Sequence, residues 1–80
     1  MISIGDVLIY DPSYRVDGVW QQRRGTEMVV IRAPMMDDTN IVVAPMQYAG
    51  FYADEIPWGK RWKLGLKAFR AVDRKPQWEV

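Results

Sequence analysis

The fold of this chain depends on how residues 62 to 68, WKLGLKA, are interpreted. Apolar residues alternate there with lysine or glycine, a period of two that is typical of a strand with its basic side toward water. A helix would also place apolar residues on one face, but the glycine in the middle would cost it about 1 kcal/mol. No Ser, Thr or Asn cap comes before the segment either. The pattern therefore favours a strand over a helix.

Upstream, three runs rich in β-branched residues predict further strands. Turn-forming residues or prolines bound each run. Asp17-Gly18 lies between Val16 and Val19-Trp20 and predicts a two-residue hairpin turn. Asp37-Asp38-Thr39-Asn40 predicts the turn of a second hairpin, with short polar side chains capping backbone amides. The three predicted strands cover residues 7–10, 27–32 and 41–44.

The second and third of these runs do not alternate. Val29, Val30 and Ile31 are consecutive, as are the apolar residues at 41 to 43. A strand with water on one face would alternate, so both faces of this pair should be covered. The cover could be the C-terminal segment, the curl of the sheet into a barrel, or a second subunit.

Five or six short strands with frequent turns predict an all-β fold, either a small SH3-like barrel or two orthogonal short sheets. Residues 74–76 should form a turn, and residues 77–80 could add a last edge strand. The alternative is an α+β fold, a curved antiparallel sheet with one helix over residues 60–72. Residues 1–80 should form a single small domain, because a chain of this length cannot support two cores.

Composition limits the class of function. The chain has no cysteine and no histidine, so it lacks thiolate metal ligands, the usual general base and the usual zinc ligand. Its first residues do not resemble a secretory signal, and charges interrupt every apolar run. We therefore expect a cytoplasmic protein with no membrane partner.

An enzymatic function is not expected. The adjacent carboxylate pairs are Asp37-Asp38 and Asp54-Glu55, and neighbours on an extended chain point to opposite faces. Asp37-Asp38-Thr39-Asn40 lacks the regular spacing of a calcium loop, and no glycine-rich phosphate loop is present. We predict no catalytic residue, no metal site and no cofactor.

Residues 51 to 62, FYADEIPWGKRW, are the best candidate for a binding surface. Together with Tyr48 just before it, this stretch places five aromatic residues within the fifteen positions from 48 to 62. So small a domain cannot easily bury all of them beside its aliphatic strands. Exposed Tyr and Trp are typical of interface hot spots, and the neighbouring acids would suit a basic or proline-rich segment. Alternatively, Trp58 and Trp62 could plug an open end of the barrel. The predicted protein-binding residues are Tyr48, Phe51, Tyr52, Asp54, Glu55 and Trp58.

The C-terminal part of the chain supports a second hypothesis. Residues 51 to 80 carry seven Lys or Arg and four acids, although the net charge of the whole chain is only +1. Basic side chains among aromatic ones are typical of nucleic-acid binding, and a strand over residues 61 to 67 would place three of them on one face. The alternative nucleic-acid-binding residues are Arg61, Trp62, Lys63, Lys67 and Arg70.

Taken together, the sequence predicts a non-enzymatic protein-binding module. It would act as an adaptor or inhibitor, by docking onto another protein or occluding it through the aromatic-rich loop. By analogy alone, such genes are common on phages and other mobile elements. A homodimer is expected, because a second subunit could cover the apolar strands and enlarge a small core. The alternative function is that of a small nucleic-acid-binding β-barrel.

Overall fold

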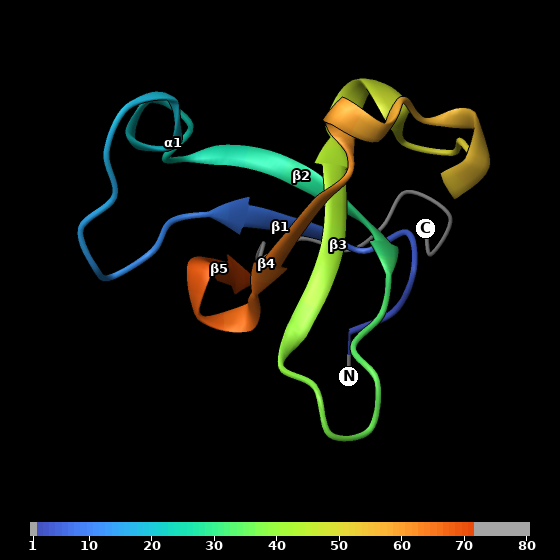
Figure 1. Ribbon diagram of the computed structural model, residues 1–80, viewed down its shortest axis with the longest axis horizontal. Coiled ribbons are helices and arrows are strands. Elements are labelled where there is room, and N and C mark those ends of the chain that lie inside the picture. The colour runs from blue at the N-terminus through green and yellow to red at the C-terminus, as the bar shows by residue number, and fades with distance from the viewer. Residues whose placement is uncertain (1, 72–80) are drawn as a thin grey trace, which may run out of the picture.

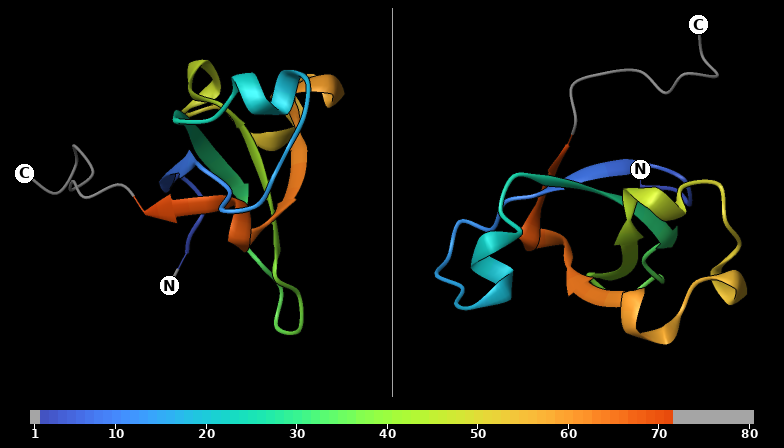
Figure 2. Two further views of the ribbon diagram at one scale, coloured as in Figure 1. Left: turned by 90° about the vertical axis from the view of Figure 1, so that its left-hand side faces the viewer. Right: turned by 90° about the horizontal axis from the view of Figure 1, so that it is seen from above.

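The computed structural model describes residues 2 to 71, and its main feature is a curled five-stranded antiparallel sheet (Figure 1). The strand order is β4-β3-β2-β1-β5, and Figure 2 shows the sheet curling into a half-barrel. This arrangement confirms the all-β prediction and is consistent with a small all-β barrel. The strands are β1 (Val7–Tyr10), β2 (Thr26–Arg32), β3 (Asn40–Pro45), β4 (Trp62–Gly65) and β5 (Phe69–Ala71).

Short helical turns fill the connections between the strands. One four-residue α-helix, α1 (Val19–Gln22), precedes β2. The 3-10 turns η1 (Met46–Tyr48), η2 (Ala53–Glu55) and η3 (Trp58–Lys60) lie between β3 and β4, and η4 (Leu66–Ala68) joins β4 to β5. Between residues 2 and 71, no helix has the length and apolar character needed to cross a membrane.

The segment from residue 62 to residue 68, on which the fold prediction depended, is a strand only in its first half. β4 pairs with β3, but it ends at Gly65, and η4 then turns the chain into β5. Ala68 is fully buried in this turn, and the Leu66 amide donates to the Thr39 carbonyl at 2.8 Å. The alternative prediction, a helix over residues 60–72, is therefore wrong for the part of this range that the structure describes. The predicted turn at 74–76 and the strand at 77–80 lie outside the described residues.

The predicted hairpin at Asp17-Gly18 is also wrong. Gly18 has the expected positive φ, 64°, but it is the N-cap residue of α1 and does not close a hairpin. The Trp20 ring packs 5.5 Å from the rings of Tyr10 and Trp62, centre to centre, against the main core. Tertiary packing of this ring therefore accounts for the departure from the local turn preference.

The other hairpin prediction is confirmed. β2 and β3 pair antiparallel, and the connection over residues 33 to 39 contains most of the predicted turn. The Asp38 carboxylate accepts the backbone N–H of Asn40 at 2.9 Å, so its side chain caps a backbone amide as expected.

Both faces of the β2–β3 pair are covered, as their unbroken apolar runs predict. On the second face, Val29, Ile31 and Ala44 pack with Ile56, which comes from the loop after β3. The cover of these residues thus comes from the chain's own loop. The main cluster on the first face comprises Leu8, Tyr10, Met28, Val30, Ile41, Val43 and Ala68.

Candidate functional site

The aromatic loop is anchored by a single aliphatic side chain. Ile56 is only 1% exposed, although every other residue from 51 to 60 is exposed. Its carbonyl oxygen accepts the Arg61 Nε–H at 2.7 Å. Burial of this one side chain fixes the middle of the loop on the second face of the sheet and leaves its flanks in solvent.

Trp58 is the most exposed tryptophan of the described chain. Its side chain is 80% exposed, and the Arg61 guanidinium carbon lies 4.0 Å from the centre of its ring. A cation at this distance is attracted to the negative face of the ring. The same guanidinium is hydrogen-bonded to the Ile56 carbonyl, so the cation over one face of the Trp58 ring is itself tied to the loop, while most of Trp58 faces water.

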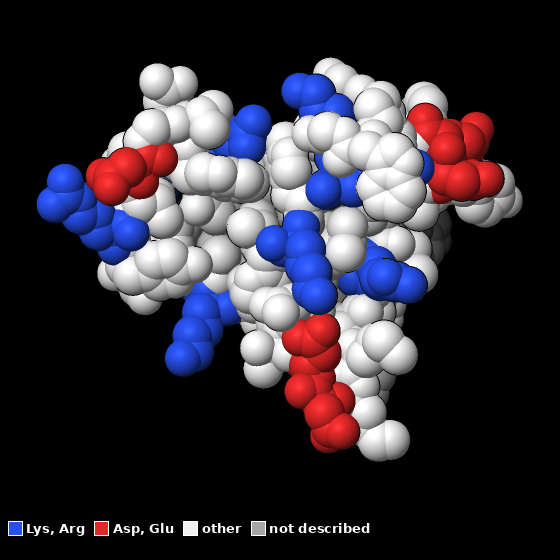
Figure 3. Space-filling model, in the orientation of Figure 1, with Lys and Arg blue, Asp and Glu red and all other residues white. Residues whose placement is uncertain are grey.

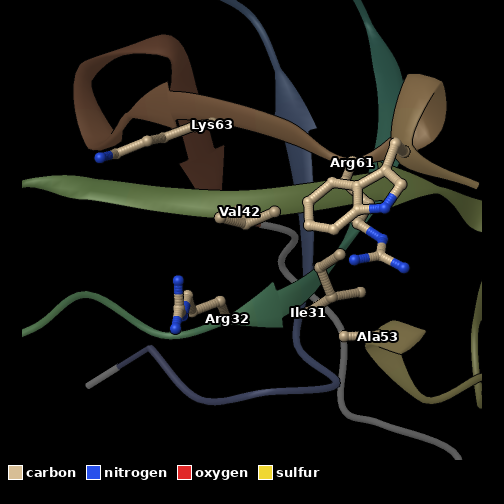
Figure 4. Close-up of a pocket in the computed structure, with 7 residues that line it drawn as sticks. Ile31, Arg32, Val42, Ala53, Arg61 and Lys63 are labelled. Atoms are coloured by element: carbon tan, nitrogen blue, oxygen red, sulfur yellow. The ribbon is translucent and has the colours of Figure 1, made fainter. Parts of the chain in front are cut away.

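A concave pocket of about 430 Å³ lies beside this ring. Its apolar lining comes from Ile31, Val42 and Ala53 together with the Trp58 indole. Figure 4 shows the basic side chains of Arg32 and Lys63 on either side of Val42, and the Arg61 guanidinium at the other end of the pocket. We call this the Trp58 pocket; its lining residues are Ile31, Arg32, Val42, Ala53, Trp58, Arg61 and Lys63.

A β-bulge helps to build the Trp58 pocket. Val30 pairs with Val43, but the register then shifts and Arg32 pairs with Val42. Val42 in turn pairs with Lys63. Bulges re-aim side chains, and this one brings the consecutive residues Ile31 and Arg32 into the same pocket. Arg32, Val42 and Lys63 therefore form one row across three strands.

The pocket carries three positive charges and no acidic side chain in its lining. On the face drawn in Figure 3, several basic side chains gather near the middle, and others lie at the left and lower left, where one acidic group is also drawn. The charge of the pocket lining is therefore opposite to that of Asp54 and Glu55, which the sequence predicted beside the exposed aromatic residues. Neither acid lines the pocket.

The predicted protein-binding residues are divided between two places. Tyr48 is partly buried against the core cluster that contains Ile56. The Phe51 ring packs edge-on to the Tyr48 ring, with the ring centres 5.7 Å apart. Tyr52 is 78% exposed, and its backbone N–H donates to the Glu55 carboxylate at 2.8 Å. Asp54 is exposed on the same turn. Of the six predicted residues, only Trp58 lines the pocket.

The predicted basic stripe does not form, because β4 ends before Lys67. Trp62 is partly buried, and its indole N–H donates to the Gly59 carbonyl at 3.1 Å. The Arg23 guanidinium lies 4.1 Å from the centre of the same ring. Arg70 is in an ion pair with Asp11, at 3.0 Å from Nε to Oδ2. Only two of the predicted nucleic-acid contacts enter the pocket, namely Arg61 and Lys63.

Sequence reasoning missed four lining residues: Ile31, Arg32, Val42 and Ala53. An arginine that ends an apolar strand is normally a solubilising residue, and only the bulge turns it toward the pocket. Within residues 2 to 71, no cluster of three acidic side chains could hold a metal ion. Burial raises the pKa of Tyr10, and Tyr14 adds to this effect, but Tyr10 belongs to the core and not to the pocket.

Comparison with family models, with curated proteins and with solved structures finds no match to this chain. Its function must therefore be argued from the Trp58 pocket itself.

Proposed function

We propose that this protein is a non-enzymatic binding module that docks onto another protein through the Trp58 pocket. It acts as an adaptor or inhibitor, by covering a surface of its partner. The observation that carries the proposal is that Trp58 is 80% exposed beside an apolar pocket, with the Arg61 guanidinium over one face of its ring. An exposed ring of this size is unfavourable in water, and a docked partner would remove it from water.

The geometry suits an interface hot spot. A hot spot is a large aromatic side chain beside a pocket, surrounded by contacts that exclude water, and its truncation typically costs at least about 2 kcal/mol of binding free energy. Trp58 has few rotatable bonds, and the Arg61 guanidinium lies over one face of its ring. Less conformational entropy is therefore lost when a partner binds.

Nucleic-acid binding is the second candidate. It is favoured by the convergence of Arg61 and Lys63 with Arg32 beside an exposed indole. It is weakened because Trp62, the predicted stacking ring, is packed between Trp20 and Arg23. Arg61 also covers part of one Trp58 face, which leaves less of the ring for a base.

Selection from a displayed library of random peptides tests the protein-binding function even while the natural partner is unidentified. Immobilised wild-type protein should enrich a related set of peptides. Trp58→Ala should lose them, because the ring provides the main contact area. Tyr14→Ala is the matched control, since this ring is 49% exposed and does not line the pocket.

Two results would decide against the proposal. If Trp58→Ala retained the enriched peptides with unchanged affinity, the pocket would not be the docking site. If gel shifts at low salt showed saturable binding to single- or double-stranded nucleic acid, and library selection enriched nothing, the second candidate would replace the first.

The SH3-like form of the barrel, the cytoplasmic location and the phage or mobile-element origin stay predictions. The homodimer also stays a prediction, although Ile56 already covers the face that a second subunit was expected to bury. Light scattering at high protein concentration tests it, and a mass of one chain would end that part of the account.

A further inference from the structure

We propose that the Trp58 pocket selects an extended acidic segment with the pattern acidic-x-apolar-x-acidic, where x is any residue. The apolar side chain lies over Val42 against Trp58, and the two carboxylates bind Arg32 and Lys63. This inference rests on the proposed function and adds the chemistry of the partner.

The apolar position follows from the floor of the pocket. Ile31 is 8% exposed and belongs to the second core cluster, and Val42 packs against that cluster while still lining the pocket. The exposed Trp58 ring adds a wall beside them. A single aliphatic or aromatic side chain placed here removes apolar surface from water on both partners.

The acidic positions follow from the two cations that flank this floor. Among residues 2 to 71, three arginines away from the pocket lie within ion-pair distance of an aspartate. Arg15 is paired with Asp17, and Arg24 and Arg70 are both paired with Asp11. Within the same range, Arg32 and Lys63 make no ion pair with a carboxylate. Two such cations beside an apolar floor are complementary to an apolar side chain flanked by acids.

The spacing follows from the sheet. Directly paired residues on neighbouring strands have Cβ atoms about 5 Å apart, so Arg32 and Lys63 are roughly 10 Å apart across Val42. In an extended peptide, side chains two residues apart lie on one face and are separated by about 6.6 Å. Acids two residues before and after the apolar anchor thus lie on its face, within reach of the long Arg and Lys side chains.

The pocket fits such a segment better than a phosphate backbone. A bound strand of nucleic acid needs a groove of cations that follows it, together with open faces for base stacking. Beyond the pocket, Lys67 lies on η4 and Arg70 is paired with Asp11. Among residues 2 to 71, these two predicted contacts therefore do not continue the row of Arg32 and Lys63 as unpaired cations on β4.

Fluorescence anisotropy with labelled, end-blocked synthetic peptides tests the inference on the full chain at low salt. The probe is Gly-Ser-Asp-Gly-Leu-Gly-Asp-Ser-Gly, and its control has both Asp replaced by Asn. Exposed ion pairs contribute about 0.2 to 1 kcal/mol each, so the Asn peptide should bind about two- to thirtyfold more weakly. Binding of the Asp peptide should also fall as salt is raised.

Two lysines four residues apart provide the matched variants. Lys63→Glu should weaken binding of the Asp peptide about threefold or more, because a repulsion replaces an attraction. Lys67→Glu makes the same charge change outside the pocket and should leave affinity within about twofold, since that exposed charge is screened. Arg32→Glu should behave like Lys63→Glu. Circular dichroism checks that each variant is folded.

Four outcomes would overturn the inference. The first is equal affinity for the Asp and Asn peptides, and the second is equal effects of Lys63→Glu and Lys67→Glu on that affinity. The third is no saturable binding of the Asp peptide. The fourth is that a short oligothymidylate binds more tightly than the Asp peptide and that its binding depends on Lys63. The first three leave the proposed function standing if library peptides still require Trp58. The fourth instead assigns the pocket to nucleic acid.

Discussion

Replacing Ile56 by alanine tests whether one side chain anchors the aromatic loop. Ile56 is 1% exposed and packs with Val29, Ile31 and Ala44. Burial of three carbon groups contributes about 2.4 kcal/mol, and the cavity left behind adds to the loss, so we expect about 3 kcal/mol of destabilisation. For a domain of this size, that change lowers the melting temperature by about 12 to 24 °C.

Urea unfolding of Ile56→Ala gives the change in free energy, and thermal melts give the change in melting temperature. Ile4→Ala is the matched control, because Ile4 is 70% exposed and should change stability by no more than about 0.5 kcal/mol. Equal and small effects of the two substitutions would refute the reasoning, since Ile56 would then lie outside the core. Peptide binding should weaken only in Ile56→Ala, because the loop also positions Trp58.

Three further predictions concern a turn, a buried phenol and the Trp58 ring. Gly18 has φ 64° and ψ −138°, a conformation that is strained for any other residue. Gly18→Ala should therefore lower the free energy of unfolding, measured in urea, by about 1 to 3 kcal/mol. Gly59→Ala is the control and should be nearly neutral, because a Cβ at Gly59 would meet open space. Burial raises the pKa of the Tyr10 phenol above 10.0, so its contribution to stability is fully present below pH 10.0 and is lost as pH rises through the folded-state pKa. Alkaline unfolding titrations should therefore show a steeper loss for wild type than for Tyr10→Phe. Arg61→Ala removes the cation over Trp58 and should weaken binding of library peptides severalfold; unchanged affinity would show that the ring needs no support.

The sequence predicted the sheet because its signals act over short distances. Consecutive apolar residues at 29 to 31 indicated cover on both faces, and the polar turn at 37 to 40 indicated the β2–β3 hairpin; both are confirmed. Predictions failed where distant contacts decide the local structure. Gly18 is the N-cap of α1, and this helix carries Trp20, whose ring packs against Tyr10 and Trp62.

The candidate site was predicted only in part. Trp58, Arg61 and Lys63 were singled out, but under two separate hypotheses, and the structure brings them together in one pocket. Arg32 could not be placed because the bulge that turns it is set by strand pairing and not by its neighbours in sequence. Ile56 was also missed, since a lone aliphatic residue among polar and aromatic ones carries no periodic signal.

The most direct test of the central claim is to observe Trp58 while a peptide binds. The chain has four tryptophans, each with an indole N–H signal in a nitrogen-15 NMR spectrum, and Trp58→Phe assigns the signal of interest. On titration with a library-selected peptide, the Trp58 signal should shift in proportion to occupancy, while those of the packed Trp20 and Trp62 should shift much less. A Trp58 signal that stays in place at saturating peptide would contradict the claim that this pocket is the docking site.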